Sequence, residues 1–265
     1  MNTPITDLLN LSGKTAIITG SAMGIGQGIA TRLHEAGASV VIADFNETAA
    51  NATAAGYNSL RPDSALAVKT DVSQNSNVAN LVAQTIAKFG SVDILVNNAG
   101  IYPFQPLSVM TEDDFMKVIN VNLRGVFLCT KFVSEQMIKQ GHGGKIINIT
   151  SIDALHPSMI GLAHYDSSKH GLWGFTKNIA LELAAHKIWV NAIAPGGIAT
   201  PGATPTDPEK ITAMKATTDA FLAKIPMHRM GESDEIGKVA LFLASDLSSY
   251  MTGEQIVVDG GALLS

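Results

Sequence analysis

Cysteine, charged residues and aromatic residues are all scarce in this sequence, and each scarcity excludes a class of protein or of binding site. Its single cysteine, Cys129, cannot form an intramolecular disulfide, and a zinc site built from several cysteines is excluded. Charged residues make up 15% of the chain and sum to −5, which gives no basic surface for nucleic acid. Aromatic residues, at 6%, are too few for a platform that stacks bases. We therefore expect no nucleic-acid partner and no bound metal.

Long apolar runs are also absent. No segment reaches the roughly 20 apolar residues that span a membrane, and the first residues show no basic region followed by a long apolar stretch. We expect a cytoplasmic protein with no membrane partner. Hydrophobic residues nevertheless form 46% of the 265-residue chain, which is enough for a large core.

The hydrophobic residues form short apolar runs separated by longer amphipathic stretches. The seven runs are 15–19, 39–44, 65–69, 92–96, 145–149, 189–193 and 255–259. Each run is nearly continuous, as in strands buried on both faces of a parallel sheet. The stretches predicted as crossover helices are 25–35, 47–55, 75–88, 113–139, 163–185 and 234–244. This alternation predicts an α/β fold with a Rossmann-type, doubly wound, seven-stranded parallel sheet flanked by helices.

One stretch departs from this alternation. Residues 200–208 are rich in Pro and Thr, and a helical-looking stretch, 209–223, follows them. Because a long loop in a compact domain is often a lid, we predict a substrate lid around 200–225, with a surface excursion of no function as the alternative. No linker rich in Pro, Gly or Ser divides the chain, so we expect one domain over 1–265.

The first predicted strand runs directly into a glycine-rich turn with the spacing T-G-x-x-x-G-x-G, from Thr19 through Gly20 and Gly24 to Gly26. Glycines between a strand and a helix let the backbone approach a pyrophosphate, whose charge is stabilised by free N–H groups and the helix dipole. The turn predicts a dinucleotide site. A tight turn without a ligand is the alternative.

The second predicted strand ends at Asp44, 24 residues beyond Gly20. Folds of this type place an acid here against the adenosine ribose, where it accepts hydrogen bonds from the ribose hydroxyls and repels a 2′-phosphate. The next two residues, Phe45 and Asn46, carry no positive charge that could bind a 2′-phosphate. The pattern favours NAD over NADP, although an acid at a strand end can also be a solvated cap.

The fifth predicted strand leads to Thr150 and Ser151, and Tyr165 and Lys169 stand near the start of the next helix. Residues four apart share one helical face, so Tyr165 and Lys169 point to the same side. An ordinary Tyr titrates near ~10, too high for a base at neutral pH. We expect the Lys169 ammonium, together with the cationic nicotinamide of NAD⁺, to lower the Tyr165 pKa.

Six motifs occur along the chain in a fixed order. They are TGSAMGIG at 19–26, Asp71-Val72, NNAG at 97–100, VNLRG at 121–125, Ser151 with YDSSK at 165–169, and PGGIAT at 195–200. With these motifs the sequence closely resembles the short-chain dehydrogenase/reductase family in its common form of about 250 residues, from Leu11 to the C-terminus. The resemblance implies a Rossmann-type fold and a homo-oligomer, either a tetramer or a dimer.

The resemblance also implies a catalytic tetrad of Asn122, Ser151, Tyr165 and Lys169. In this scheme Tyr165 takes the hydroxyl proton while hydride passes from the carbinol carbon to the nicotinamide. Ser151 holds the substrate oxygen, Lys169 also binds the nicotinamide ribose, and Asn122 holds a water that connects Lys169 to solvent.

The same resemblance assigns the cofactor contacts. Asp71 and Val72 would meet the adenine, Asn97 the adenosine ribose, and Ile198 with Thr200 the nicotinamide half. The full set expected to bind NAD is Gly20, Ser21, Met23, Gly24, Ile25, Gly26, Asp44, Phe45, Asp71, Val72, Asn97, Ala99, Gly100, Tyr165, Lys169, Pro195, Gly196, Ile198 and Thr200.

Two assignments have a competitor nearby. Asn120 lies two residues before Asn122, but the 25-residue spacing from Asn97 favours Asn122. Thr150 competes with Ser151 as the substrate hydroxyl, and strand alternation with family position favours Ser151.

The expected substrate contacts are mixed in character: Tyr102, Ser151, Asp153, His156 and Tyr165. Asp153 and His156 suit a polyol or sugar, and Tyr102 suits an alicyclic ring, although His156 can equally be a plain loop residue. We expect a NAD-dependent oxidoreductase acting on a secondary alcohol or its ketone. The alternatives are an NADPH-dependent 3-oxoacyl-thioester reductase and a catalytically inactive dinucleotide-binding regulator.

The helix after Lys169 carries a stripe formed by Gly171, Phe175, Ile179 and Leu183. This stripe is a candidate dimer contact, with packing against the chain's own sheet as the alternative.

Overall fold

A computed structural model describes residues 2–157, 159–200 and 222–264. Seven parallel strands form the central sheet in the order β3-β2-β1-β4-β5-β6-β9. They are β1 (Thr15–Thr19), β2 (Ser39–Asp44), β3 (Ala65–Lys69), β4 (Ile94–Asn97), β5 (Gly144–Ile149), β6 (Ile188–Pro195) and β9 (Gln255–Val258). The predicted Rossmann-type, single-domain, doubly wound fold is confirmed. The order reverses between β1 and β4, which is the point where such sheets bind their ligands.

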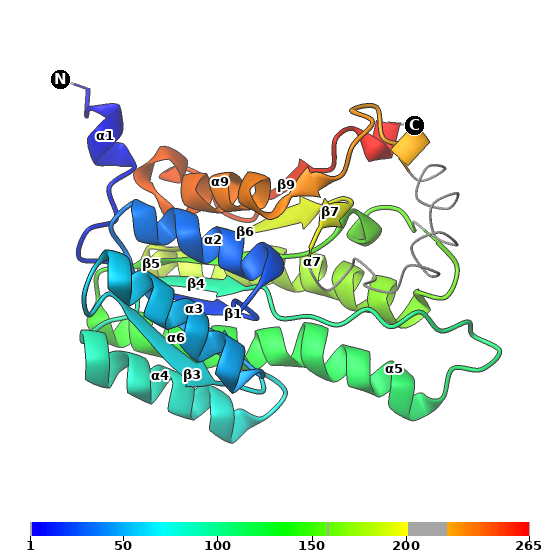
Figure 1. The fold of residues 1–265 in the computed structure, drawn as a ribbon, viewed down its shortest axis with the longest axis horizontal. Helices are drawn as coiled ribbons and strands as arrows, with labels where there is room; N and C mark the ends of the chain where they lie inside the picture. The colour runs from blue at the N-terminus through cyan, green and yellow to red at the C-terminus, as the bar shows by residue number, and fades with distance from the viewer. Residues whose placement is uncertain (1, 158, 201–221, 265) are drawn as a thin grey trace.

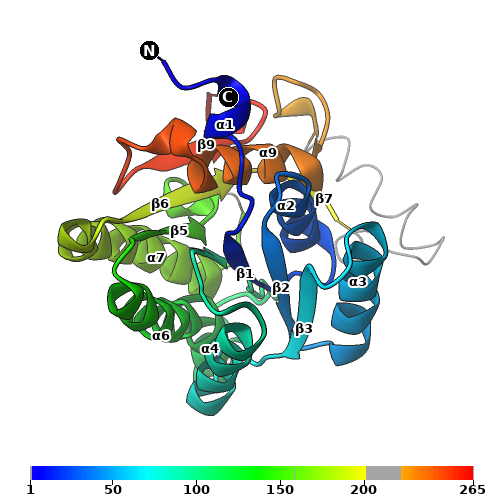
Figure 2. The same cartoon turned by 90° about the vertical axis from the view of Figure 1, so that its left-hand side faces the viewer.

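Helices cover both faces of the sheet (Figure 1). The helices whose bounds the structure gives are α1 (Ile5–Leu8), which has no buried residue, α2 (Gly24–Glu35), α3 (Glu47–Leu60), α4 (Asn75–Phe89), α5 (Glu112–Ile119), α6 (Gly125–Gln140), α7 (Ala163–Leu183) and α9 (Ser233–Ala244). Figure 2 shows α2 and α3 on one side of the sheet and α4, α6 and α7 on the other. The helix predicted over 47–55 is longer in the structure, where α3 continues to Leu60.

The strands β1 to β6 each contribute to two separate cores because successive side chains point to opposite faces, whereas the edge strand β9 contributes to one. In β1, Ile18 packs with α2, α3 and α9, whereas the adjacent Ile17 packs with α4, α6 and α7. Both side chains are fully buried. The nearly continuous apolar runs of the sequence are thus the mark of a sheet covered on both sides.

The prediction of a single helix over 113–139 is wrong. The structure divides it into α5, a π-helical turn over Asn120–Arg124, and α6. At the end of the turn the Gly125 N–H donates to the Asn120 carbonyl, five residues back. Such turns insert one residue into a helix and often lie at functional sites. This one contains Asn122.

Helices α2 and α9 cross closely over the sheet because glycines stand where they meet. A Cβ at Gly28 would lie 2.6 Å from the Ser233 carbonyl oxygen, and a Cβ at Gly237 would lie 2.5 Å from the Gly28 carbonyl oxygen. Because the obstructing atoms belong to the backbone, neither side chain can be accommodated without moving a helix.

The predicted lid around 200–225 falls mainly on 201–221, outside the described residues. In the part of the chain that the structure describes, no helix combines the length and apolar character needed to cross a membrane.

Candidate active site

A cleft of about 920 Å³ lies at the carboxyl ends of the strands, beside the point where the strand order reverses. Twelve of the residues predicted to bind NAD line it: Gly20, Met23, Gly24, Ile25, Gly26, Asp44, Phe45, Asp71, Val72, Ala99, Gly100 and Thr200. Tyr102 lines it as well. The seven other predicted contacts, Ser21, Asn97, Tyr165, Lys169, Pro195, Gly196 and Ile198, are not among the residues that line it.

The glycine turn forms a cradle that side chains would fill. Gly20 has a φ of +63°, and a Cβ there would lie 2.8 Å from the Ala99 Cα. A Cβ at Gly26 would collide with the Gly20 carbonyl oxygen, and one at Gly24, where φ is +60°, would fill the space beside the Thr200 side chain. Glycine thus lets the turn pack closely on itself and on Ala99, so that the backbone at the α2 N-terminus borders the cleft, which fits a dinucleotide pyrophosphate.

Asp44 joins the two turns that border the cleft. Its Oδ2 accepts a hydrogen bond from the Ala22 N–H at 3.0 Å, and its Oδ1 accepts one from the Asn46 N–H at 2.9 Å. The carboxylate therefore holds the glycine turn against the end of β2 while still facing the cleft.

The two asparagines at the end of β4 point in different directions. Asn97 is buried beneath the cleft and donates to Asn148 Oδ1 at 2.8 Å and to Thr130 Oγ1 at 3.1 Å. Asn98 lines the cleft, and its amide donates to the carbonyl oxygens of Thr19 and Gly20. Asn98 thus supports the cradle, a role that sequence analysis missed because it assigned the cofactor contact to Asn97.

Other predicted cofactor residues also lie below the surface of the cleft. Ser21 is fully buried and donates to the Ile18 carbonyl. Pro195 ends β6 opposite Val258, and a Cβ at Gly196 would lie 2.7 Å from the Asp259 Cβ. These three residues therefore pack within the fold and are not among the residues that line the cleft.

Tyr165 and Lys169 lie together, as their spacing on α7 predicts. The Lys169 ammonium is 5.5 Å from the centre of the Tyr165 ring. It is buried and donates to the Ile149 carbonyl at 2.7 Å. The Tyr102 ring, at the end of the cleft, meets the Tyr165 ring edge-on with 6.0 Å between the centroids. The Tyr165 group is therefore continuous with the cleft.

Asn122 links three parts of the site. Its Oδ1 accepts from the Ile101 N–H at 2.8 Å, and its Nδ2 donates to the Ile101 carbonyl and to Ser168 Oγ. The π-helical turn thus ties the loop after β4 to α7, one residue away from Lys169. The neighbouring Asn120 lines the cleft instead.

Ser151 and Asp153 form a buried pair beside Tyr165. The Ser151 hydroxyl donates to Asp153 Oδ2 at 2.8 Å, and the Asp153 N–H donates to Ser151 Oγ at 3.1 Å. Thr150, the competing hydroxyl, lies within hydrogen-bond distance of the Ile193 carbonyl and of the Gln255 side-chain amide, within the sheet. The geometry favours Ser151 as the hydroxyl that faces Tyr165.

The chain's own residues make Tyr165 a weaker acid and Lys169 a weaker base. Burial raises the pKa of Tyr165 well above its usual value, the hydrogen bond with Ser151 opposes this, and the charges on Asp153 and Asp166 raise it further. Burial lowers the pKa of Lys169 to about 8, while Asp153 acts in the opposite direction. In the protein without cofactor, burial raises the Tyr165 pKa by more than the neighbouring groups lower it, so the lowered pKa that we expected does not arise from the side chains alone.

His156 lies on an exposed loop, and its Nδ1 contacts the carbonyl of the adjacent Pro157. This placement agrees with a plain loop residue, the alternative already named. Tyr102 is 56% exposed and remains open to a ligand.

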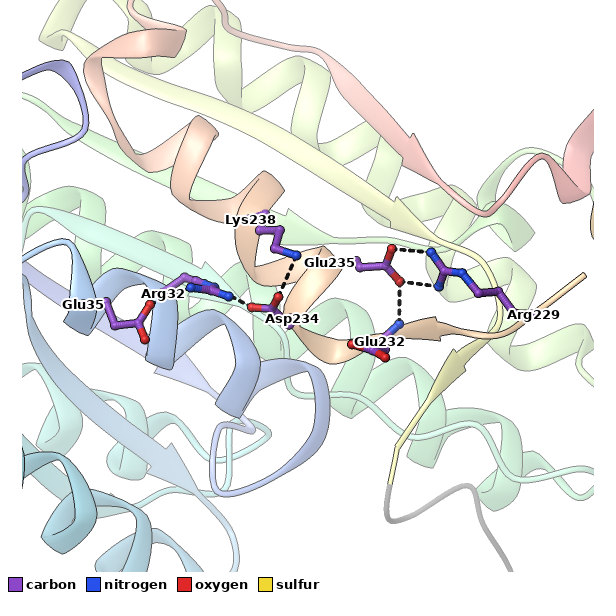
Figure 3. Close-up of polar contacts among 7 residues, drawn as sticks. All are labelled: Arg32, Glu35, Arg229, Glu232, Asp234, Glu235 and Lys238. Carbon is purple, nitrogen blue, oxygen red and sulfur yellow. Dashed lines mark hydrogen bonds and ion pairs between the residues drawn. The ribbon is translucent and has the colours of Figure 1, made fainter. Parts of the chain in front are cut away.

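A small two-stranded sheet forms the wall behind Thr200. In it β7 (Ile198–Ala199) pairs in parallel with β8 (Gly231–Glu232). Arg229 makes a bidentate ion pair with Glu235 of α9, with both N–O distances at 2.7 Å, and Glu235 also accepts from the Glu232 N–H (Figure 3). Separately, Asp234 bridges Arg32 of α2 and Lys238. The Glu235 contacts fasten β8 to the start of α9, and the Asp234 contact with Arg32 ties α2 to the same turn.

The chain is similar to known proteins over nearly all of its length. Residues 20–262 match the family model described as Enoyl-(Acyl carrier protein) reductase. A short-chain dehydrogenase/reductase from Aspergillus oryzae is 42% identical over 96% of this chain and 97% of its own length. The chain belongs to the short-chain dehydrogenase/reductase family. It is an oxidoreductase of the kind that binds a nicotinamide cofactor.

Further similarities within the short-chain dehydrogenase/reductase family cover the whole fold. The crystal structure of a family member from Mycobacterium marinum superposes with a TM-score of 0.91 at 36% identity, over 99% of this chain and 100% of the other. The 2-dehydro-3-deoxy-D-gluconate 5-dehydrogenase of Dickeya dadantii is 40% identical over 98% of this chain and 99% of its own. A 3-oxoacyl-[acyl-carrier-protein] reductase of Thermotoga maritima is 39% identical over 97% and 100%. Relatives of similar identity thus have different named substrates.

Proposed function

We propose that this protein is a NAD-dependent dehydrogenase that oxidises a secondary alcohol, of the polyol, sugar or cyclic alcohol class, and reduces the corresponding ketone. The observation that carries the cofactor choice is Asp44, a carboxylate held at the adenosine end of the cleft by the Ala22 and Asn46 amides. It offers acceptors to ribose hydroxyls and opposes a 2′-phosphate. No Arg or Lys occupies the glycine turn or the two positions after Asp44.

The cleft residues fit this cofactor at both ends. Gly20, Gly24 and Gly26 would hold the pyrophosphate against the start of α2, and Thr200 would lie on the nicotinamide side. When bound, the cofactor supplies the hydride acceptor for the carbinol carbon. All other steps are carried out by side chains of the chain itself.

The proton steps are assigned to Tyr165 and its partners. Tyr165 takes the hydroxyl proton in oxidation and returns it in reduction. Ser151 hydrogen-bonds the reacting oxygen, and Lys169 places a positive charge beside the phenol ring. Because burial raises the Tyr165 pKa, the phenolate forms only at alkaline pH or when a cationic group, such as the nicotinamide of NAD⁺, binds beside it.

The 3-oxoacyl-[acyl-carrier-protein] reductases among the relatives define the competing function. NADH formation at 340 nm, with NAD⁺ or NADP⁺ against a panel of polyols, sugars, cyclic and aromatic secondary alcohols, separates the two. Oxidation with NAD⁺ supports the proposal. Oxoacyl-thioester reduction with NADPH, without NAD⁺-dependent oxidation of any alcohol, overturns it.

We also propose a homo-oligomer, a dimer or tetramer, that forms through α6 and α7. The predicted stripe on α7 divides: Leu183 is buried and Ile179 packs in the chain's own core, whereas Phe175 meets the half-exposed Phe127 of α6 edge-on. Leu181 adds an apolar side chain that is 79% exposed. Light scattering after gel filtration tests this, and a monomer at micromolar concentration contradicts it.

A further inference from the structure

Two loops beside the active site expose large apolar side chains. The loop after β4 carries Tyr102 and Phe104, and the loop before α7 carries Met159 and Ile160. All four side chains are exposed, Phe104 to 61% and Ile160 to 83%. We call these four side chains the apolar rim. Apolar side chains that are exposed as a group, and not singly, are typical of a surface that binds another molecule.

The structure joins the two loops directly. The Gln105 N–H donates to the Gly161 carbonyl at 2.8 Å. A Cβ at Gly161 would lie 2.7 Å from the Phe104 ring, so this ring lies against the Gly161 backbone. Ile160 is the residue before Gly161. The two halves of the rim are therefore adjacent, although they lie more than 50 residues apart in the sequence.

The rim begins at the reacting tyrosine. The Tyr102 ring meets the Tyr165 ring edge-on, with 6.0 Å between the centroids. At most about 7 Å of chain separates Tyr102 from Phe104. Pro103, between them, fixes its own φ and restricts the backbone of Tyr102, so the loop loses less conformational freedom when it binds a ligand. A substituent that extends from a carbinol at Tyr165 past Tyr102 can thus reach Phe104.

The loops that carry the rim offer little to a charged or strongly polar group. Residues 101–110 and 154–163 contain no Lys, Arg, Asp or Glu, so a phosphorylated substrate would find no cation on them. The Gln105 side-chain amide already donates to Asp114 Oδ2 at 2.6 Å. A hydroxyl bound between Phe104 and Ile160 would lose its water and gain no side-chain partner from either residue, which costs free energy.

We propose that the substrate carries an apolar ring or chain on its carbinol, and that Phe104 and Ile160 bind this group. The inference rests on the proposed function and narrows its substrate class to apolar secondary alcohols and their ketones, in preference to sugars and polyols. Each methylene group fully buried against the rim should strengthen binding about fourfold. Phe104 and Ile160 thus determine specificity, while Tyr165 retains the proton step.

The test compares two ketones that differ in one terminal group. 4-Propylcyclohexanone and 4-(2-hydroxyethyl)cyclohexanone carry chains of equal length, which end in a methyl group or a hydroxyl. In the reaction the carbonyl carbon accepts hydride from NADH and its oxygen takes the Tyr165 proton, which gives the secondary alcohol and NAD⁺. Neither chain can be reduced, so NADH consumption at 340 nm reports the ring carbonyl alone. For the wild-type protein we expect kcat/KM for the propyl ketone to exceed that for the hydroxyethyl ketone about tenfold or more, because one buries a methyl group and the other desolvates a hydroxyl.

Polar replacements in the rim should reduce this ratio. Phe104→Ser and Ile160→Ser each remove an exposed apolar side chain, and each should lower the ratio about threefold or more. Phe104→Leu keeps an apolar side chain and should retain most of the ratio. Leu60→Ser is the matched control, because Leu60 is exposed at the end of α3, outside the cleft and the rim, and it should leave the ratio unchanged. A general loss of activity affects both ketones alike and cancels in the ratio.

Three results overturn the inference: equal kcat/KM values for the two ketones in the wild-type protein, a preference for the propyl ketone that is unchanged in both Ser variants of the rim, or no reduction of either ketone. If other secondary alcohols or ketones still react with the nicotinamide cofactor, only the apolar-substrate inference fails. If none reacts, the proposed function fails with it.

Discussion

Removing the Asp44 carboxylate should change which nicotinamide cofactor the protein prefers. The carboxylate lines the cleft and has two tasks: it faces the ribose position, and it accepts hydrogen bonds from the Ala22 and Asn46 amides. Asp44→Ala removes the ribose acceptors and also loosens both turns. Asp44→Asn removes the charge while retaining one acceptor oxygen.

The magnitude follows from the lost interactions. A hydrogen bond to a charged group contributes about 1.5–3 kcal/mol, which corresponds to roughly 10- to 150-fold in a rate or equilibrium constant. We therefore expect Asp44→Ala to lower kcat/KM with NAD⁺ by about two orders of magnitude. The value with NADP⁺ should fall less or rise, because the repulsion of a 2′-phosphate is also removed. Adding Phe45→Arg to Asp44→Ala, at a position that is 73% exposed, should shift the preference further toward NADP⁺.

The assay measures kcat/KM with each cofactor, using one alcohol at a fixed concentration. Glu47→Gln is the matched control, because Glu47 is an exposed carboxylate three residues on that pairs with Lys69 outside the cleft. It should retain the wild-type ratio. A cofactor ratio in Asp44→Ala within threefold of the wild-type value, in a variant that melts normally, would remove Asp44 from the selecting role.

Further consequences can be tested separately. Tyr165→Phe should abolish turnover while NADH fluorescence still reports binding, and undiminished turnover would refute the proton role. Because burial raises the Tyr165 pKa, kcat/KM for alcohol oxidation should rise with pH through the alkaline range; a profile that falls there contradicts this. Gly237→Ala places a methyl group against the Gly28 carbonyl and should lower the unfolding free energy by about 1–3 kcal/mol in chemical denaturation. Arg229→Gln removes the ion pair with Glu235 and should weaken NADH binding about threefold or more, since it loosens the wall behind Thr200; an unchanged dissociation constant would show that this ion pair is not needed there.

The strands and the cofactor turn could be predicted because their causes are local. Continuous β-branched runs such as 15–19 and 39–44 have the same bounds in the structure as in the prediction, since a strand buried on both faces has no polar interruption. The glycine turn and Asp44 were located by spacing alone, and the structure places both at one cleft.

The residues that sequence analysis misplaced depend on contacts far away in the chain. Asn97 and Asn98 are adjacent and chemically identical, and strand alternation sends one to each side. The partner of Asn97 in the core, Asn148, lies 51 residues on. The sequence does not predict the acceptor of the Ser151 proton either, because it indicates Asp153 only as a substrate contact. Hydrogen bonds of this kind depend on where the loops lie in three dimensions, which the sequence pattern does not indicate.

The π-helical turn between α5 and α6 also determines which side of α6 faces the core. Each residue of an α-helix advances the chain by about 100°. Gly125 tolerates the extra residue by packing directly against Val72, where a Cβ would lie 2.8 Å from a methyl group. Deleting one residue from Asn120–Arg124 would make a regular helix and would rotate Asn122 away from Ile101 or α6 away from its core. The active site therefore depends on an irregularity that an idealised helix would erase.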